Sequence, residues 1–164
     1  MTRTLGWGHI NINVSNLEAS IEFYKKLGFQ PFVPSVPYLN LNAQTRAEVP
    51  SDARNALGLA AGAAGRACIL QLDNGFPKID LTELTAEPKH SPLANDDLGL
   101  VRICLISEDL ISTYENLKSQ SVEFLTPPSA CHERLADVAV CKDPDGTLIE
   151  LLQVYLERWG PYLS

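Results

Sequence analysis

Two segments of this 164-residue chain follow the same plan. Each begins with a strand-like run, continues through a capping residue into an amphipathic helix, and ends in further strand-like runs, over residues 7–32 and again over residues 100–125. In the first helix Leu17, Ile21 and Tyr24 recur at the spacing of one helix face. Because such a unit is too small to bury its own sheet face, the repeat predicts that the two units pack together.

Caps and hydrophobic pattern place the elements of both halves. The first helix is expected over residues 17–27 after Asn16, and the second over residues 110–118 after Asp109, since both side chains are good N-caps. Strands are expected at residues 9–14, 30–33, 38–41, 67–72 and 78–84, and at residues 102–106, 122–125, 136–141 and 147–154. Each half reads β-α-β-β-β, which predicts an α+β fold of two βαβββ modules.

The predicted organisation is a first module at residues 1–84, a connector at residues 85–98 rich in Pro and polar residues, and a second module with a C-terminal tail at residues 99–164. An insert, residues 42–66, interrupts the first module, and a short helix is expected in it near residues 54–61. Loops this long are usually lids, interface elements or disordered segments.

The charge balance and hydropathy exclude several partners. The chain has 20 acidic and 13 basic residues, a net charge of −7, and no Lys/Arg cluster that could neutralise phosphates, so we expect no nucleic-acid partner. No apolar run approaches the roughly 20 residues that a membrane span needs. The amino terminus lacks the apolar core of a signal peptide, which favours a cytoplasmic location.

The four cysteines form no Cys-x-x-Cys pair, which argues against zinc-ribbon and thioredoxin-like sites. Residues expected in the core are the cysteines Cys68, Cys104 and Cys141, which lie among apolar residues, and the aromatic residues Trp7, Tyr24 and Tyr38. Cys131 precedes His132, and a Cys–His pair can form a nucleophilic thiolate. Neighbouring residues of a strand point to opposite faces, however, which argues against that pairing.

One local motif stands out near the C-terminus. In Asp143-Pro144-Asp145-Gly146, Pro presets φ, Asp bonds its own backbone and Gly takes the positive-φ position, so the motif predicts a tight turn. In the strand that follows, Glu150 lies between Ile149 and Leu151. Because a bare carboxylate is costly to bury, Glu150 must be solvated, paired or bound to a metal.

These features together resemble the vicinal oxygen chelate superfamily: paired βαβββ modules, His9 on the opening strand, the helix end Phe23-Tyr24-Lys25-Lys26-Leu27-Gly28-Phe29, and the turn at residues 143–146 before Glu150. The superfamily includes glyoxalase I, methylmalonyl-CoA epimerase, extradiol dioxygenases and bleomycin or fosfomycin resistance proteins. The resemblance covers residues 6 to about 154. It implies a glyoxalase-like fold in which two curved mixed sheets surround a shared cavity, a scaffold that hosts many chemistries.

The resemblance also implies four cavity positions on the first and last strands of the modules: His9, Asp80, Arg102 and Glu150. In the repeat, His9 corresponds to Arg102, and Asp80 corresponds to Glu150. His9, Asp80 and Glu150 would suit one divalent ion, such as Mg²⁺, Mn²⁺, Fe²⁺, Co²⁺, Ni²⁺ or Zn²⁺. Arg102 departs from the family, which usually carries a His there, because a guanidinium cannot ligate a metal.

Three interpretations of Arg102 stay open. It pairs with Glu150 as a buried salt bridge across the module interface, or it clamps a substrate carboxylate, enolate or phenolate, or it leaves a metal site of three protein ligands in place. His132 is a further candidate for substrate binding and general-base work, and a solvent-exposed loop histidine is the alternative.

The resemblance favours a lyase or isomerase that catalyses proton transfer, isomerisation or elimination on a small carbonyl or enolisable substrate, aromatic and polyketide-like ones included. Glu150 would be base or ligand, His9 ligand or acid, and Arg102 the oxyanion stabiliser. Two other functions stay open: a metal-dependent lyase or dioxygenase of the same superfamily, and a non-catalytic small-molecule binding or resistance protein. Family members often dimerise, so a homodimer is expected.

Overall fold

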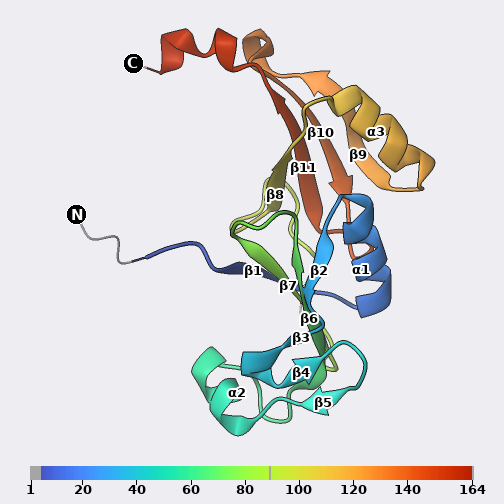
Figure 1. Ribbon diagram of the computed structural model, residues 1–164, viewed down its shortest axis with the longest axis vertical. Coiled ribbons are helices and arrows are strands. Elements are labelled where there is room, and N and C mark those ends of the chain that lie inside the picture. Colours follow the sequence, from blue (N-terminus) through green and yellow to red (C-terminus); the bar gives the residue numbers. More distant parts are fainter. Residues whose placement is uncertain (1–4, 89, 164) are drawn as a thin grey trace. The chain divides into compact units, whose positions relative to one another are not determined.

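The computed structural model of the protein describes residues 5–88 and 90–163. The chain divides into two compact units, Met1–Lys89 and His90–Ser164, each with its own sheet (Figure 1). The boundary falls inside the predicted connector at residues 85–98. Among the described residues, no helix combines the length and the apolar character needed to cross a membrane.

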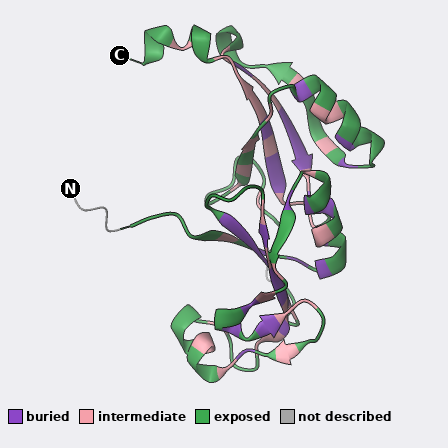
Figure 2. Ribbon diagram, viewed as in Figure 1, coloured by how far each residue is buried: buried purple, intermediate pink, exposed green. Residues whose placement is uncertain are grey.

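Unit 1 is built on a mixed sheet in the order β1-β7-β6-β2. Its elements are β1 (His9–Asn13), α1 (Leu17–Lys26), β2 (Gln30–Val33), β6 (Ala64–Gln71) and β7 (Lys78–Leu84). β1 pairs with β7 in parallel, and the other pairs are antiparallel. α1 packs against β7, which is buried along nearly its whole length (Figure 2).

Unit 2 repeats this topology with the order β8-β11-β10-β9. Its elements are β8 (Arg102–Ile106), α3 (Leu110–Ser119), β9 (Glu123–Ala130), η2 (His132–Arg134), β10 (Ala136–Lys142), β11 (Leu148–Val154), η3 (Leu156–Arg158) and η4 (Gly160–Tyr162). β8 pairs with β11 in parallel, and α3 packs on β9, β10 and β11. The predicted strand at residues 122–125 extends to Ala130. The α+β class is confirmed.

The repeat is preserved in how each helix begins. Asn16 and Asp109 cap α1 and α3, each accepting a hydrogen bond from the backbone N–H three residues later, as predicted. The closing strand of each unit adds a second acceptor. Glu83 accepts from the N–H of Leu17 at 2.7 Å, and Gln153 accepts from the N–H of Leu110 at 2.9 Å. These acceptors satisfy N–H groups that have no partner within the helix.

The segment between β2 and β6, residues 34–63, is called here the insert; it begins and ends somewhat earlier than the predicted insert at residues 42–66. It contains β3 (Ser35–Val36), η1 (Pro37–Leu39), β4 (Leu41–Asn42), β5 (Ala47–Glu48) and α2 (Ser51–Leu57). The strand predicted over residues 38–41 is wrong, because Pro37 begins a 3-10 turn and Asn40 ends it in the left-handed region, at φ 53°. The helix predicted over residues 54–61 lies earlier, since it starts after Pro50 and ends at Gly58, where φ is 65°.

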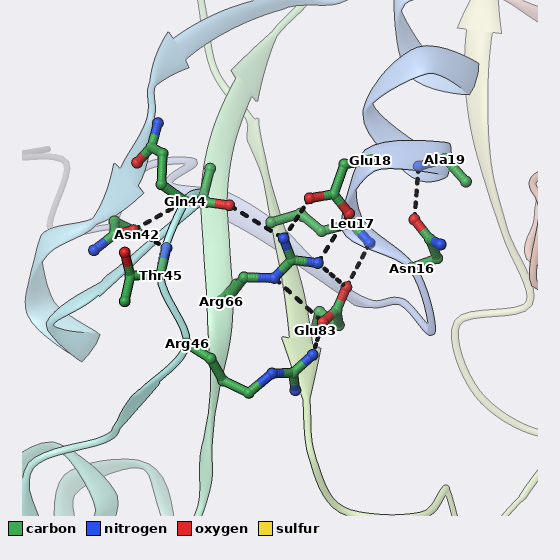
Figure 3. A network of polar contacts seen from close by, with 11 residues as sticks. Asn16, Leu17, Glu18, Ala19, Asn42, Gln44, Thr45, Arg46, Arg66 and Glu83 are labelled. Atoms are coloured by element: carbon green, nitrogen blue, oxygen red, sulfur yellow. Dashed lines mark hydrogen bonds and ion pairs between the residues drawn. The ribbon is translucent and has the colours of Figure 1, made fainter.

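The insert has a small core of its own. Val36, Leu39, Leu41 and Val49 are at most 4% exposed and pack on Ala67 of β6. An ion-pair network joins the insert to the sheet through Arg46 and Glu83, and Arg66 of the sheet pairs with Glu18 of α1 and with Glu83 (Figure 3). Apolar burial and these ion pairs together hold the insert on the sheet.

The expectation for buried aromatic and cysteine residues is only partly confirmed. Tyr24 is fully buried, but Trp7 is 70% exposed and Tyr38 is 48% exposed. Cys68 and Cys141 are buried, whereas Cys104 is exposed. Cys104 lies on the face of the unit 2 sheet that α3 does not cover, and Tyr38 lies in the turn η1 rather than in a strand. Local sequence does not distinguish either position from a buried one.

Candidate functional site

The turn before β11 forms as its sequence predicts. The Asp143 carboxylate is buried and accepts hydrogen bonds from the N–H groups of Asp145, at 3.0 Å, and Thr147, at 2.8 Å. Gly146 has a φ of 100°, and its N–H bonds the carbonyl of Asp143. This rigid turn fixes where β11 begins and therefore where Glu150 lies in the sheet.

Glu150 lies on the face of the unit 2 sheet turned away from α3, called here the open face. The side chain of Gln153 reaches the start of α3, so the alternation of the strand places Glu150 on the opposite face. On the neighbouring strand β8 the residues of the open face are exposed: Arg102, Cys104 and Ile106. Glu150 is opposite Cys104 in the parallel register.

Arg102 and Glu150 form the polar centre of the open face. The Nε of Arg102 donates to Glu150 Oε2, and its Nη1 donates to Asn95 Oδ1 at 3.0 Å. The Arg102 side chain is 38% exposed and that of Glu150 is 17% exposed, so the pair is accessible. Both residues belong to unit 2, so the expectation of a buried salt bridge across the module interface is wrong, although the pairing itself is present. Loss of water around the Cys104 thiol, together with the Glu150 charge and hydrogen bond, raises the pKa of Cys104 to about 11.

In unit 1, His9 and Asp80 come together with Tyr38. The Asp80 side chain is 1% exposed, and its Oδ2 lies 3.6 Å from Nε2 of His9. The Tyr38 hydroxyl donates to Asp80 Oδ2 and lies 3.3 Å from His9 Nε2. The Tyr38 ring stacks on the His9 ring, with the centroids 5.8 Å apart. The other Asp80 oxygen, Oδ1, is buried and lacks a hydrogen-bond partner among the described residues.

Tyr38 is the site residue that sequence reasoning missed. It belongs to the insert, so the repeat gives it no counterpart, and its hydroxyl reaches Asp80 across 42 positions of sequence. Burial and the neighbouring Asp80 carboxylate raise the pKa of Tyr38 well above its ordinary value. The one available signal was Pro37, which favours a turn at this point rather than a strand.

The two pairs occupy the same register in their units. His9 is opposite Lys78 and Asp80 follows two residues later, just as Arg102 is opposite Leu148 and Glu150 follows two residues later. His9 and Arg102 are therefore equivalent positions, and so are Asp80 and Glu150. Each unit carries a basic residue on its first strand beside a carboxylate on its last strand.

His132 lies apart from both pairs. It begins the short turn η2 before β10, its side chain is 82% exposed, and its Nε2 is 3.6 Å from Oε1 of Glu133. This position matches the loop-histidine alternative more closely than a place beside Arg102. A role for His132 in substrate binding remains a prediction.

The residues do not fit a resident divalent ion as they stand. Within either unit, the described residues include no group of three or more His, Cys, Asp or Glu arranged to hold a metal. In unit 2 the carboxylate of Glu150 already bonds Arg102, a fixed cation that repels a second one. In unit 1 a phenol hydroxyl already bonds the Asp80 oxygen nearest His9. We therefore derive no chemical step through a metal.

A family model described as Glyoxalase/Bleomycin resistance protein/Dioxygenase superfamily matches residues 6–151. A comparison with curated proteins found no match. Several solved structures are similar, among them a glyoxalase family protein from Bacillus cereus, with a TM-score of 0.72 and 18% identity over 93% of this chain and 96% of that chain. A superfamily member from Sphaerobacter thermophilus has a TM-score of 0.61 and 20% identity over 92% of this chain and 99% of that chain.

Glyoxalase I from Zea mays has a TM-score of 0.61 and 18% identity. The match covers 88% of this chain and 43% of the maize protein. At such identities the likeness extends to the fold alone, so the maize enzyme's activity is not transferred to this chain.

Proposed function

The chain belongs to the Glyoxalase/Bleomycin resistance protein/Dioxygenase superfamily, and on that premise we propose that it is an enzyme that moves a proton on a small carbonyl or enolisable substrate. The reaction class is isomerisation or elimination, with aromatic and polyketide-like ketones among the candidate substrates. The observation that carries the proposal is the accessible Arg102–Glu150 pair on the open face of unit 2.

Arg102 is proposed to hold the substrate oxygen. A guanidinium has five N–H donors, and the bonds to Glu150 and Asn95 leave some of them for a ligand. When a proton leaves the carbon next to a carbonyl, negative charge moves onto the carbonyl oxygen. A fixed guanidinium beside that oxygen stabilises the charge as it forms, and such donors contribute about 10²–10³-fold to rate.

Glu150 is proposed to take the proton. The Glu150 carboxylate lies beside the Arg102 guanidinium that would hold the enolate oxygen. The base that takes the proton and the cation that stabilises the enolate charge are therefore next to each other. The electron pair of the broken C–H bond forms the enolate, and it then either recaptures the proton at another carbon or expels a leaving group from the adjacent carbon. A positioned base of this kind supplies about 10²–10⁴-fold.

Hydrogen–deuterium exchange tests this proposal without knowledge of the natural substrate. The protein is incubated in D₂O with hydroxyketones, β-keto esters and phenolic ketones, and loss of the α-C–H signal is followed by NMR. We expect catalysed exchange for at least one probe, lowered about 10²–10⁴-fold in Glu150→Gln. In Arg102→Ala we expect that catalysed exchange is lost and that the probe binds more weakly.

The matched control is Glu123→Gln. Glu123 lies on β9 of the same sheet and pairs with Lys142 at 3.1 Å, but it is 72% exposed and away from Arg102. Exchange should persist in this variant. Full exchange in Glu150→Gln would remove Glu150 from the mechanism. Saturable binding of a probe with no exchange in any sample would instead support the alternative of a non-catalytic binding protein.

A further inference from the structure

Tyr38 lies between the two unit 1 residues that a divalent ion would need. Its hydroxyl is bonded to Asp80 Oδ2 and lies 3.3 Å from Nε2 of His9. Asp80 Oδ2 and His9 Nε2 are 3.6 Å apart. An ion shared between these two atoms would compete with the Tyr38 hydroxyl for Asp80 Oδ2. The second oxygen, Oδ1, is buried and gives no alternative approach.

The fold holds Tyr38 firmly in that place. The neighbouring residues Val36 and Leu39 are at most 4% exposed and belong to the core of the insert. Pro37 and the left-handed Asn40 fix the turn on either side. The Tyr38 ring stacks on His9 and the Tyr38 hydroxyl bonds Asp80, so both the ring and the hydroxyl have a partner. A side chain supported in this way loses little entropy when its hydroxyl bonds Asp80.

The phenol acts here as a donor and not as a ligand. The Tyr38 hydroxyl donates a hydrogen bond to Asp80 Oδ2, so its oxygen is not the deprotonated atom that metal coordination requires. The equivalent carboxylate of unit 2, Glu150, is bonded by Arg102, which cannot deprotonate. Each unit therefore places a hydrogen-bond donor on the carboxylate of its closing strand.

We propose that Tyr38 and Arg102 keep the Asp80 and Glu150 carboxylates out of metal coordination, so that this chain uses hydrogen-bond donors where a divalent ion would otherwise sit. The inference concerns the same residues as the proposed function but does not depend on turnover. A protein that lacks the proposed activity can still exclude metal, and an active one can still bind it, so the two proposals can fail separately.

Metal binding by the folded 164-residue chain tests this inference. The protein is stripped with EDTA, dialysed, and titrated with Zn²⁺, Ni²⁺ and Mn²⁺ by calorimetry, and metal content after purification is measured by mass spectrometry. We expect wild type to hold far less than one equivalent. Tyr38→Phe removes only the hydroxyl and keeps the ring, so we expect its Zn²⁺ affinity to rise by about tenfold or more. Arg102→His, which leaves Glu150 beside a potential ligand, should show a similar gain.

Tyr155→Phe is the matched control. The Tyr155 hydroxyl also donates to an aspartate, Asp137, at 2.8 Å, and the second oxygen of Asp137 is likewise buried with no partner among the described residues. Its ring, however, contacts Arg158 rather than a histidine. We expect no gain in metal affinity in this variant. Circular dichroism and thermal melting verify that each variant is folded.

Two results would overturn the inference. One is a wild-type protein that carries a stoichiometric divalent ion lost in His9→Ala, a measurement that does not depend on any Tyr38 variant folding. The other is a folded Tyr38→Phe protein that binds Zn²⁺ no more tightly than wild type.

Discussion

Arg102 of β8 donates from its Nε to Glu150 of β11, at the register where His9 of β1 faces Asp80 of β7. The duplicated module thus keeps the carboxylate in both copies and changes the residue beside it. The difference between a titratable imidazole and a permanent guanidinium gives the two copies different chemistry. Unit 2 has a fixed cation that can hold an oxyanion, and unit 1 has a histidine that stacks on a tyrosine.

The Arg102–Glu150 pair should add little to stability. The side chains are 38% and 17% exposed, so solvent screens their attraction. A double-mutant cycle of Arg102→Ala and Glu150→Ala, measured by urea unfolding, should give a coupling free energy of about 1 kcal/mol or less. A coupling above about 3 kcal/mol would indicate a structural, desolvated pair instead. The pair would then be poorly suited to receive a substrate.

The reactivity of Cys104 reports on the same pair. Partial desolvation and the Glu150 charge raise the pKa of Cys104, while the Arg102 charge acts in the opposite direction. Removing the negative charge in Glu150→Gln should lower this pKa, increase the thiolate fraction and speed alkylation by iodoacetamide at pH 8. Arg102→Ala removes a charge that lowers the pKa of Cys104, so alkylation of Cys104 should be slower in this variant. Peptide mass spectrometry gives the rate, and the exposed Cys131 in the same sample should react equally in all variants.

Glu83 should make stability depend on pH. Burial alone would raise the pKa of Glu83, but hydrogen bonds from Arg66 and the N–H of Leu17, with the charges of Arg66 and Arg46, outweigh it and lower the pKa (Figure 3). A carboxyl whose pKa is lower in the folded chain than in the unfolded chain stabilises the fold at any pH above its unfolded-state pKa, which is about 4.3 for Glu. This stabilisation is lost as the pH falls through the pKa that the group has in the folded chain.

Glu83→Gln removes this contribution. The free energy of unfolding should fall by about 3 kcal/mol at pH 7, because Arg66 and the start of α1 lose a buried partner. The gap to wild type should shrink below about pH 4, where the Glu83 carboxylate is protonated in the unfolded chain. Glu22→Gln, in an exposed pair with Lys25, should change stability by about 0.5 kcal/mol or less at either pH. A pH-independent gap for Glu83→Gln would contradict the electrostatic explanation.

Gly65 is required by close packing of two strands. A Cβ at this position would lie 2.0 Å from the carbonyl oxygen of Glu83, a backbone atom that a rotamer change cannot move. Gly65→Ala should therefore separate β6 from β7 and lower the free energy of unfolding by about 2–3 kcal/mol, measured by thermal or urea unfolding. Gly160→Ala, where a Cβ meets no atom within 4 Å among the described residues, should be close to neutral.

Features set by short stretches of chain were predictable from sequence. The caps Asn16 and Asp109, both main helices and the turn at residues 143–146 were confirmed, because each depends on residues within a few positions of one another. The duplicated topology was confirmed as well, because the repeated order of elements indicated it. The repeat also predicted that His9 and Arg102 are equivalent, and the strand registers agree. The insert was the weakest region, since neither copy of the repeat constrains it.

Sequence by itself determined the fold class and the repeat that makes His9 equivalent to Arg102 and Asp80 equivalent to Glu150. Only the tertiary structure decided what each carboxylate meets there. Tyr38 reaches Asp80 from 42 positions away, and Arg102 reaches Glu150 from 48 positions away. Such contacts depend on strand register and on how the insert packs over the sheet, and no local propensity encodes them. The donors that occupy the two carboxylates were therefore visible only once the chain was folded.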